Sequence, residues 1–156
     1  MATTYRTPIT IDSLVTHGCA VCRITHEDLT DADTSQTLTL ATLAVGRGES
    51  AIPANSRPMF AWANVIVPFS GGGNSAVTIA PGDAGDIDEL ISAVSIFTGA
   101  SGILPKSGTY ALGTFKAAYA PIATVTTTDG TCAGLTAGIL EIVIVYEQIL
   151  TDSVTG

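Results

Sequence analysis

A long apolar segment close to the C-terminus constrains the fold more than any other feature of the sequence. In residues 138–150, apolar side chains fill both sets of alternating positions: Leu140, Ile142, Ile144, Tyr146 and Leu150 in one set, and Ile139, Val143, Val145 and Ile149 in the other. Only Glu141 and Glu147 interrupt the second set. Alternation with a period of two indicates a β-strand, whose successive side chains point to opposite faces of a sheet. Because both faces are apolar, we predict a central strand covered on both sides through its middle.

Strand signals also dominate the rest of the chain. Short apolar or alternating runs, separated by Gly, Pro, Asn and Asp, lie at residues 9–14, 19–24, 36–45, 50–53, 59–69, 77–79, 109–112 and 122–128. The alternation slips by one residue at positions 41–42, which indicates a β-bulge or a bend. In the run 59–69, Val65, Val67 and Phe69 are predicted to share one face.

One segment has helical periodicity. Its apolar residues recur with a 3.6-residue period, at Ile87, Leu90, Ile91, Val94 and Phe97. Asp86 and Glu89 are placed as a variant capping box at its start. We therefore predict a short helix over residues 87–97, although its β-branched residues disfavour one. A loop is expected over residues 98–108.

The composition supports a single ordered domain. The chain has 156 residues, of which 46% are hydrophobic and 13% charged, and 23 are threonines; such a mixture favours ordered β structure over disorder. No internal repeat and no series of crossover helices is apparent. We expect an all-β fold, a single-domain jelly roll or β-sandwich of about eight strands with one short helix. It would span residues 9–150, between an N-terminal arm at residues 1–8 and a C-terminal tail at residues 151–156.

The charge of the chain argues against two classes of partner. The formal net charge is −8, and the six basic residues are scattered along the sequence. Such a surface repels phosphate, so neither nucleic acid nor an anionic membrane is an expected partner. The N-terminal residues lack the apolar core of a signal peptide, and no apolar run approaches the ~20 residues of a membrane span. We expect synthesis in the cytosol without an N-terminal export signal.

The strongest candidate for metal chemistry is a cluster of thiols and imidazoles formed by His17, Cys19, Cys22 and His26. These are the ligand types that Zn²⁺ prefers. All four fall within one short segment, whereas structural zinc sites usually combine two distant pairs. In an extended strand, moreover, Cys19 and Cys22 point to opposite faces. We therefore interpret them as small, partly buried strand residues, and a zinc site or a redox pair remains a less favoured alternative.

The cysteine count agrees with reduced thiols. Cys19, Cys22 and Cys132 leave one residue unpaired in any disulfide scheme. Three cysteines are also too few for a disulfide-stabilised secreted scaffold.

Two polar or flexible segments could bind ions. Four carboxylates gather in one segment, Asp83, Asp86, Asp88 and Glu89, but their spacing does not match a calcium loop, and a solvated turn with a helix cap is favoured. The glycines Gly71, Gly72 and Gly73 could bring amides to an anion, yet no phosphate-binding motif surrounds them. We interpret them as a flexible turn.

One aromatic pair is a candidate recognition site, and no residues form a catalytic motif. Phe60 and Trp62, close to Arg57, could form an exposed aromatic platform for a sugar or a protein. Filling of the core is the favoured interpretation. The chain lacks the G-x-S-x-G motif and has only two histidines, so we predict no catalytic, cofactor-binding or metal-binding residues and expect that the protein is not an enzyme.

Four stretches together resemble small structural proteins of tailed-bacteriophage virions, and capsid decoration (cement) proteins above all. They are V-T-I-A-P-G-D-A-G-D-I-D at 77–88, I-F-T-G-A at 96–100, A-T-V-T-T-T-D-G at 123–130 and L-T-A-G-I-L-E-I-V-I-V-Y at 135–146. The resemblance covers mainly the C-terminal half and rests on Gly-Asp turns and the final strand.

The resemblance implies a jelly-roll-like domain that assembles as a homotrimer on the outer surface of an icosahedral capsid. There it would bind the major capsid protein and tie neighbouring copies together. The acidic surface and the missing catalytic residues agree with such a role. We expect the arm at residues 1–8 to lie across a neighbouring subunit. A tail or head-completion protein is the first alternative, and a carbohydrate-binding jelly-roll module is the second.

Overall fold

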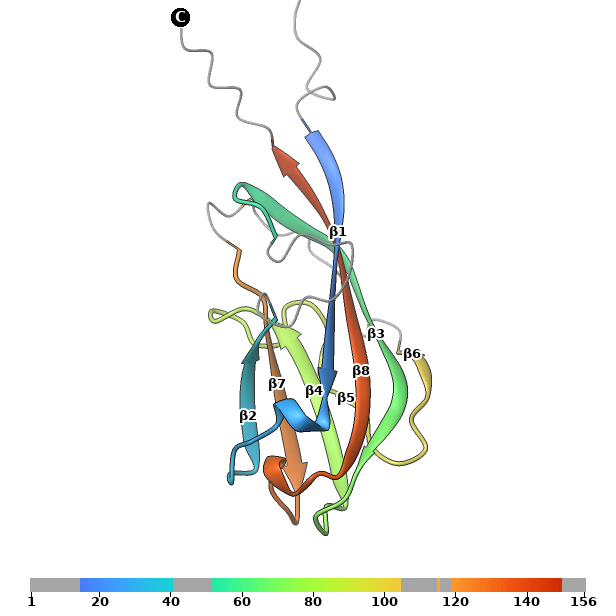
Figure 1. The fold of residues 1–156 in the computed structure, drawn as a ribbon. Coiled ribbons are helices and arrows are strands. Elements are labelled where there is room, and N and C mark those ends of the chain that lie inside the picture. Colours follow the sequence, from blue (N-terminus) through green and yellow to red (C-terminus); the bar gives the residue numbers. More distant parts are fainter. Residues whose placement is uncertain (1–14, 41–51, 105–114, 116–118, 150–156) are drawn as a thin grey trace, which may run out of the picture.

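The protein is an all-β sandwich of two four-stranded antiparallel sheets (Figure 1), as the sequence predicts. The structure is a computed structural model, and it describes residues 15–40, 52–104, 115 and 119–149. The predicted arm (1–8), the C-terminal tail (151–156), the runs 9–14 and 109–112, and the phase slip at 41–42 lie outside the described residues.

The first sheet contains the long strands. Its order is β1 (Val15–Thr25), β8 (Ala137–Ile149), β3 (Ser56–Ser70) and β6 (Gly102–Leu104). Strand β8 lies between β1 and β3, so the prediction that the last apolar segment is a central strand is confirmed. Its register with β1 is unbroken from Val15 opposite Ile149 to Thr25 opposite Ile139.

The second sheet is built from shorter strands. Its order is β2 (Ser35–Thr39), β7 (Ile122–Thr128), β4 (Ala76–Gly82) and β5 (Val94–Ser95). Within the first sheet, β1 pairs with β8 and β3 pairs with β6. Within the second sheet, β2 pairs with β7 and β4 pairs with β5. The chain therefore folds back on itself in four nested antiparallel pairs.

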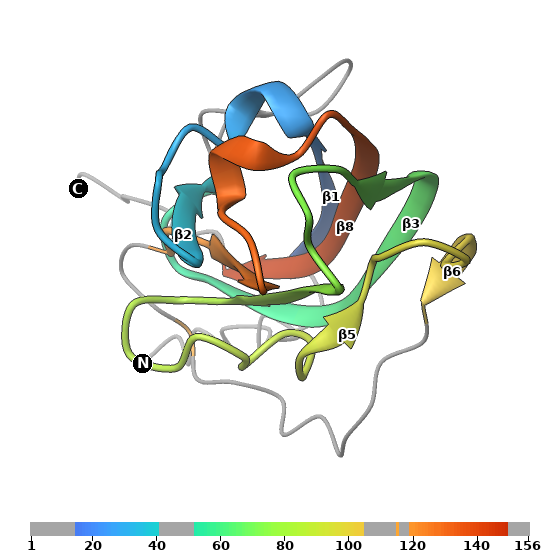
Figure 2. The same cartoon turned by 90° about the horizontal axis from the view of Figure 1, so that it is seen from below.

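Helical structure in the described residues is confined to two single turns. The 3-10 turns η2 (His26–Asp28) and η4 (Cys132–Gly134) lie against each other at one end of the sandwich (Figure 2). Backbone hydrogen bonds connect η4 to the segment that follows η2. The amides of Cys132 and Ala133 donate to the carbonyls of Asp33 and Asp31, at 2.9 and 2.8 Å.

One hydrophobic core fills the space between the sheets. Its fully buried side chains come from both: Phe69, Leu140, Ile142 and Ile144 from the first sheet, and Val77, Ile79 and Val125 from the second. Burial of each such side chain contributes about 1.5–3 kcal/mol. The even-numbered positions of β8 supply the central row of this core.

The helix predicted over residues 87–97 is wrong, because this segment consists of turns and the short strand β5. The amides of Leu90 and Ile91 both donate to the carbonyl of Pro81, at 3.0 and 3.1 Å, and the amide of Ile96 donates to that of Val77 at 2.9 Å. These bonds to β4 replace the i to i−4 bonds of a helix. Leu90, Ile91 and Ile96 still reach the core, so tertiary packing overrides the helical period. The predicted loop 98–108 likewise contains β6.

Three register shifts in β3 change which side chains face the core. The register with β8 shifts between Pro58 and Phe60, between Val65 and Val67, and between Val67 and Ser70. Val65 and Phe69 are buried, but Val67 is 36% exposed, so the prediction that all three share a face is wrong for Val67. Within the predicted run 50–53, residues 52 and 53 are not in a strand.

Candidate interaction face

The first sheet turns one face to the core and the other outward, and the register defines what the outward face presents. Residues directly opposite each other on paired strands point to the same side of a sheet. Two adjacent rows of outward side chains are apolar: Cys19, Val145 and Phe60 in one row, and Val21, Val143 and Trp62 in the next. We call these six residues the outer patch. It crosses the neighbouring strands β1, β8 and β3.

The outer patch is open in the part of the chain that the structure describes. Phe60 is 56% exposed and Cys19 is exposed, whereas the other four side chains are half-buried. The prediction that β8 is covered on both sides is confirmed for its even-numbered face, whereas Ile139, Val143 and Val145 on the odd-numbered face are half-buried. No further sheet of described residues lies over them.

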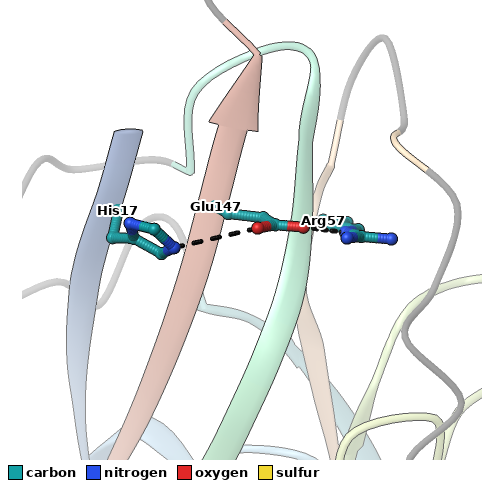
Figure 3. A network of polar contacts seen from close by, with 3 residues as sticks. All are labelled: His17, Arg57 and Glu147. Carbon is teal, nitrogen blue, oxygen red and sulfur yellow. Dashed lines mark hydrogen bonds and ion pairs between the residues drawn. The ribbon is translucent and has the colours of Figure 1, made fainter. Parts of the chain in front are cut away.

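An ionic row borders the patch on one side. Glu147 of β8 accepts a hydrogen bond from Nε of Arg57 on β3, and its Oε2 lies 3.8 Å from Nε2 of His17 on β1 (Figure 3). Glu147 is only 8% exposed, and Arg57 and His17 are the polar partners of its carboxylate. The guanidinium of Arg57 also lies over the ring of Phe115, 4.6 Å from its centroid, a favourable cation–π distance.

A second ionic row borders the opposite side. Arg23 of β1 donates from Nε and Nη2 to Oε1 of Glu141 on β8, at 3.2 and 2.6 Å. Asn64 of β3 continues this row. Beyond it on β6, Ile103 pairs with Asn64 and is 67% exposed. An apolar centre between paired charges is the arrangement that protein–protein interfaces show.

The predicted aromatic pair therefore lies at the surface. The bulge after Pro58 turns Phe60 and Trp62 outward and points Ala61 and Ala63 into the core. Filling of the core, the favoured interpretation, is wrong for Phe60, while Trp62 is half-buried. Arg57 does share this face, where it is engaged by Glu147 and Phe115.

The cysteines and histidines considered for zinc are not brought together. Cys19 faces outward and Cys22 faces the core, where its thiol donates to the carbonyl of Leu40 at 3.1 Å. His17 contacts Glu147, and His26 begins η2. Within the described ranges, no three His, Cys, Asp or Glu side chains are grouped so that they could hold a metal ion.

The three thiols are free, and two of them are buried. Desolvation raises the pKa of Cys22 from 9.0 to about 11. Burial also raises the pKa of Cys132, although a hydrogen bond with Thr127 acts in the opposite direction. A buried thiol with a raised pKa is a poor nucleophile at neutral pH.

The acidic and glycine-rich segments are turns. Oδ1 of Asp83 accepts the amides of Gly85 and Asp86 at 2.8 and 3.0 Å, so this carboxylate closes a turn after β4. Gly71, Gly72 and Gly73 all have positive φ angles, of 116°, 63° and 74°, which favours glycine. The prediction of a turn at these glycines is confirmed.

Comparison with known proteins shows a likeness in fold to a solved structure. No protein-family model matches the sequence, and no curated protein matches it. No helix in the described ranges is long and apolar enough to cross a membrane. In fold, the chain is similar to a chain of the solved cyanophage Pam1 capsid asymmetric unit, with a TM-score of 0.59 and 14% sequence identity. The match covers 95% of this chain and 92% of that one, so the two share a fold over nearly their whole lengths.

Proposed function

We propose that the chain is a structural protein of a bacteriophage virion, a cement protein that decorates the outer surface of an icosahedral capsid. It would act as a homotrimer that binds the major capsid protein and bridges neighbouring copies of it. The observation that carries the proposal is the similarity in fold, over nearly the full length of both chains, to a chain of a phage capsid.

Because one fold can serve many functions, support from the molecular surface matters as well. The outer patch and its two ionic rows have the anatomy of a protein-binding face. The strand order 1-8-3-6 and 2-7-4-5 supports a jelly roll, an architecture that viral capsid proteins use. We extend the proposal to a protein that is not an enzyme and takes no cofactor.

The proposed mechanism is state-selective binding. A ligand that binds only the expanded capsid lattice stabilises that state by its own binding free energy. The net charge of −8 suits the outside of a DNA-filled shell and disfavours nucleic acid and anionic membranes as partners. The chain would be synthesised in the host cytoplasm and would reach the virion by assembly.

Cosedimentation with capsids tests the proposal. The purified chain is mixed with expanded empty shells and, separately, with unexpanded precursor shells of the same phage. We expect saturable binding to the expanded shells and little binding to the precursors. Absence of binding to either form would contradict the proposal.

Two alternatives predict other outcomes with the same preparation. A tail or head-completion protein would bind tails or the capsid portal and leave the shell surface bare. A carbohydrate-binding module would use the exposed Phe60 ring to stack against a sugar. It would bind immobilised glycans, and a Phe60→Ala variant would lose that binding.

A further inference from the structure

We propose that the outer patch is the surface through which copies of this chain bind one another. The partner is a second copy, and the contact centres on Phe60 and Trp62 of β3 and on Val143 and Val145 of β8. The inference deepens the proposed function and rests on it only for the number of copies in the assembly.

Exposed apolar side chains are concentrated on the first sheet. Five large hydrophobic residues are strongly exposed in the described ranges: Phe60, Ile66, Val67, Ile87 and Ile103. All except Ile87 lie on β3 or β6 of the first sheet. Single exposed apolar residues are common on protein surfaces, but a group of them on the sheet that carries the outer patch, to which Phe60 itself belongs, marks an interaction site.

The distribution of charge favours a second copy as the partner. Two copies with a net charge of −8 each repel unless their contact is electrically balanced. Every lysine or arginine in the described ranges, which means Arg23 and Arg57, lies on the outward face of the first sheet, and each is paired with a glutamate of β8. That face is therefore neutral.

The remaining described carboxylates lie in connections away from this face: Glu27, Asp28, Asp31, Asp33, Asp83, Asp86, Asp88, Glu89 and Asp129. A partner with a basic surface would be drawn to those connections. A second acidic copy avoids them and can approach through the neutral face without bringing like charges together. Both the apolar rows and the balanced charges thus fit a copy of the same chain.

The position of the aromatic residues indicates where the contact is tightest. Phe60 and Trp62 lie in the two central rows, with an ionic row on either side. Aromatic residues surrounded by a polar rim are the usual centres of binding energy in interfaces. Replacing Phe60 with glutamate places a charge in that centre, and because Phe60 is exposed in the single chain the fold should tolerate it.

The test compares Phe60→Glu with Ile87→Glu in the full-length chain. Ile87 is 52% exposed and lies between β4 and β5, away from the patch, so its variant introduces the same charge elsewhere. Light scattering after size-exclusion chromatography measures the mass. We expect the wild type and Ile87→Glu to form oligomers of equal size, and Phe60→Glu to associate at least about tenfold more weakly and to approach 15.9 kDa.

Labelling of Cys19 gives a second readout. This thiol lies in the outer patch and is exposed in the single chain, so we expect slow reaction with the thiol reagent DTNB in the wild type and fast reaction in Phe60→Glu. Added salt should strengthen the association, because it screens the repulsion between acidic copies. Matching far-ultraviolet circular dichroism spectra of the two variants would show that both are folded.

Three results would overturn the inference: a monomeric wild type, an unchanged oligomer in Phe60→Glu, or equal loss of association in both variants. If the wild type is monomeric and Phe60→Glu loses binding to expanded shells, the patch binds the capsid protein instead of a copy. If the wild type forms the oligomer through the outer patch but does not bind expanded shells, the inference stands and the proposed function fails.

Discussion

At the scale of single residues, close contacts between glycines and aromatic rings define how β8 packs. Gly138 has a φ of 149° and lies against the ring of Phe69, where an added Cβ would collide with the ring carbons. Gly18 lies in the same way against the ring of Tyr146, its partner across the sheet. The contacts between these glycines and the aromatic rings cannot be predicted from the sequence, because each contact joins segments that are far apart in the chain.

We predict that Gly138→Ala destabilises the fold strongly. The collision with Phe69 adds an overpacking cost of about 1–3 kcal/mol to the strain of a side chain at this φ, about 1 kcal/mol or more. Gly73→Ala is the matched control, because Gly73 has a φ of 74° and nothing within 4 Å of an added Cβ. Urea unfolding measures both, and equal losses would show that Gly138 and Phe69 are not in close contact.

The buried thiol of Cys22 makes stability depend on alkaline pH. Its pKa in the folded protein, about 11, lies above the ordinary value of 9.0, so the folded state holds the proton more tightly than the unfolded state. The resulting stability is complete below pH 9 and is lost as the pH rises toward 11. The slope approaches about 1.4 kcal/mol per pH unit for one thiol.

Cys22→Ala should reduce this loss between pH 9 and 11, measured by urea unfolding at each pH. Cys132 contributes in the same direction, so part of the dependence should persist. Cys19→Ala serves as the control at an exposed position. A pH dependence identical in Cys22→Ala and the wild type would contradict the buried placement of this thiol.

At the scale of elements, β8 has two faces that differ in burial. From Gly138 to Tyr146 the even-numbered residues are buried and the odd-numbered ones are half-buried, and the alternation ends at Glu147, which is buried on the odd-numbered face. The alternation in the sequence predicts the strand and its central place in the sheet. It does not predict that one apolar face is only half-buried by the described residues, because the same alternation arises whether a face is buried by the fold or by a partner.

We predict that Ile142→Ala and Val143→Ala, at adjacent positions of β8, differ sharply in cost. Ile142 is fully buried, and its truncation should cost about 2–5 kcal/mol of unfolding free energy. Val143 faces outward, and its truncation should cost less than about 1 kcal/mol. Both are measured by urea unfolding in the Phe60→Glu background, which removes the contribution of association. Equal costs would contradict the assigned orientation of β8.

The sequence predicts a strand correctly where the alternation of apolar residues is local. It does not predict which side chains face outward where pairing with a neighbouring strand sets their orientation. The run 122–128 coincides with β7, and residues 77–79 lie within β4. The bulges of β3, which place Phe60 and Val67 outward, arise from pairing with β8 and leave no local signal. The row of His17, Arg57 and Glu147 could have been found only from the register of three distant segments.

At the scale of the whole molecule, the fold separates a neutral apolar face from acidic connections. In the proposed assembly, copies of the chain would meet through the neutral face, and like charge on the acidic connections would disfavour other contacts. The prediction of a single all-β sandwich is confirmed. The decoration of a capsid remains a proposal supported by the likeness of the fold to a phage capsid chain.

The thermal stability of the capsid tests the central claim most directly. Expanded empty shells are heated with and without a saturating amount of the chain, and their disassembly is followed by calorimetry or light scattering. We predict that the disassembly temperature rises with occupancy and reaches a plateau when the sites on the shell are full. A disassembly temperature that stays unchanged while the chain is bound at saturation would contradict the claim that this protein stabilises a capsid.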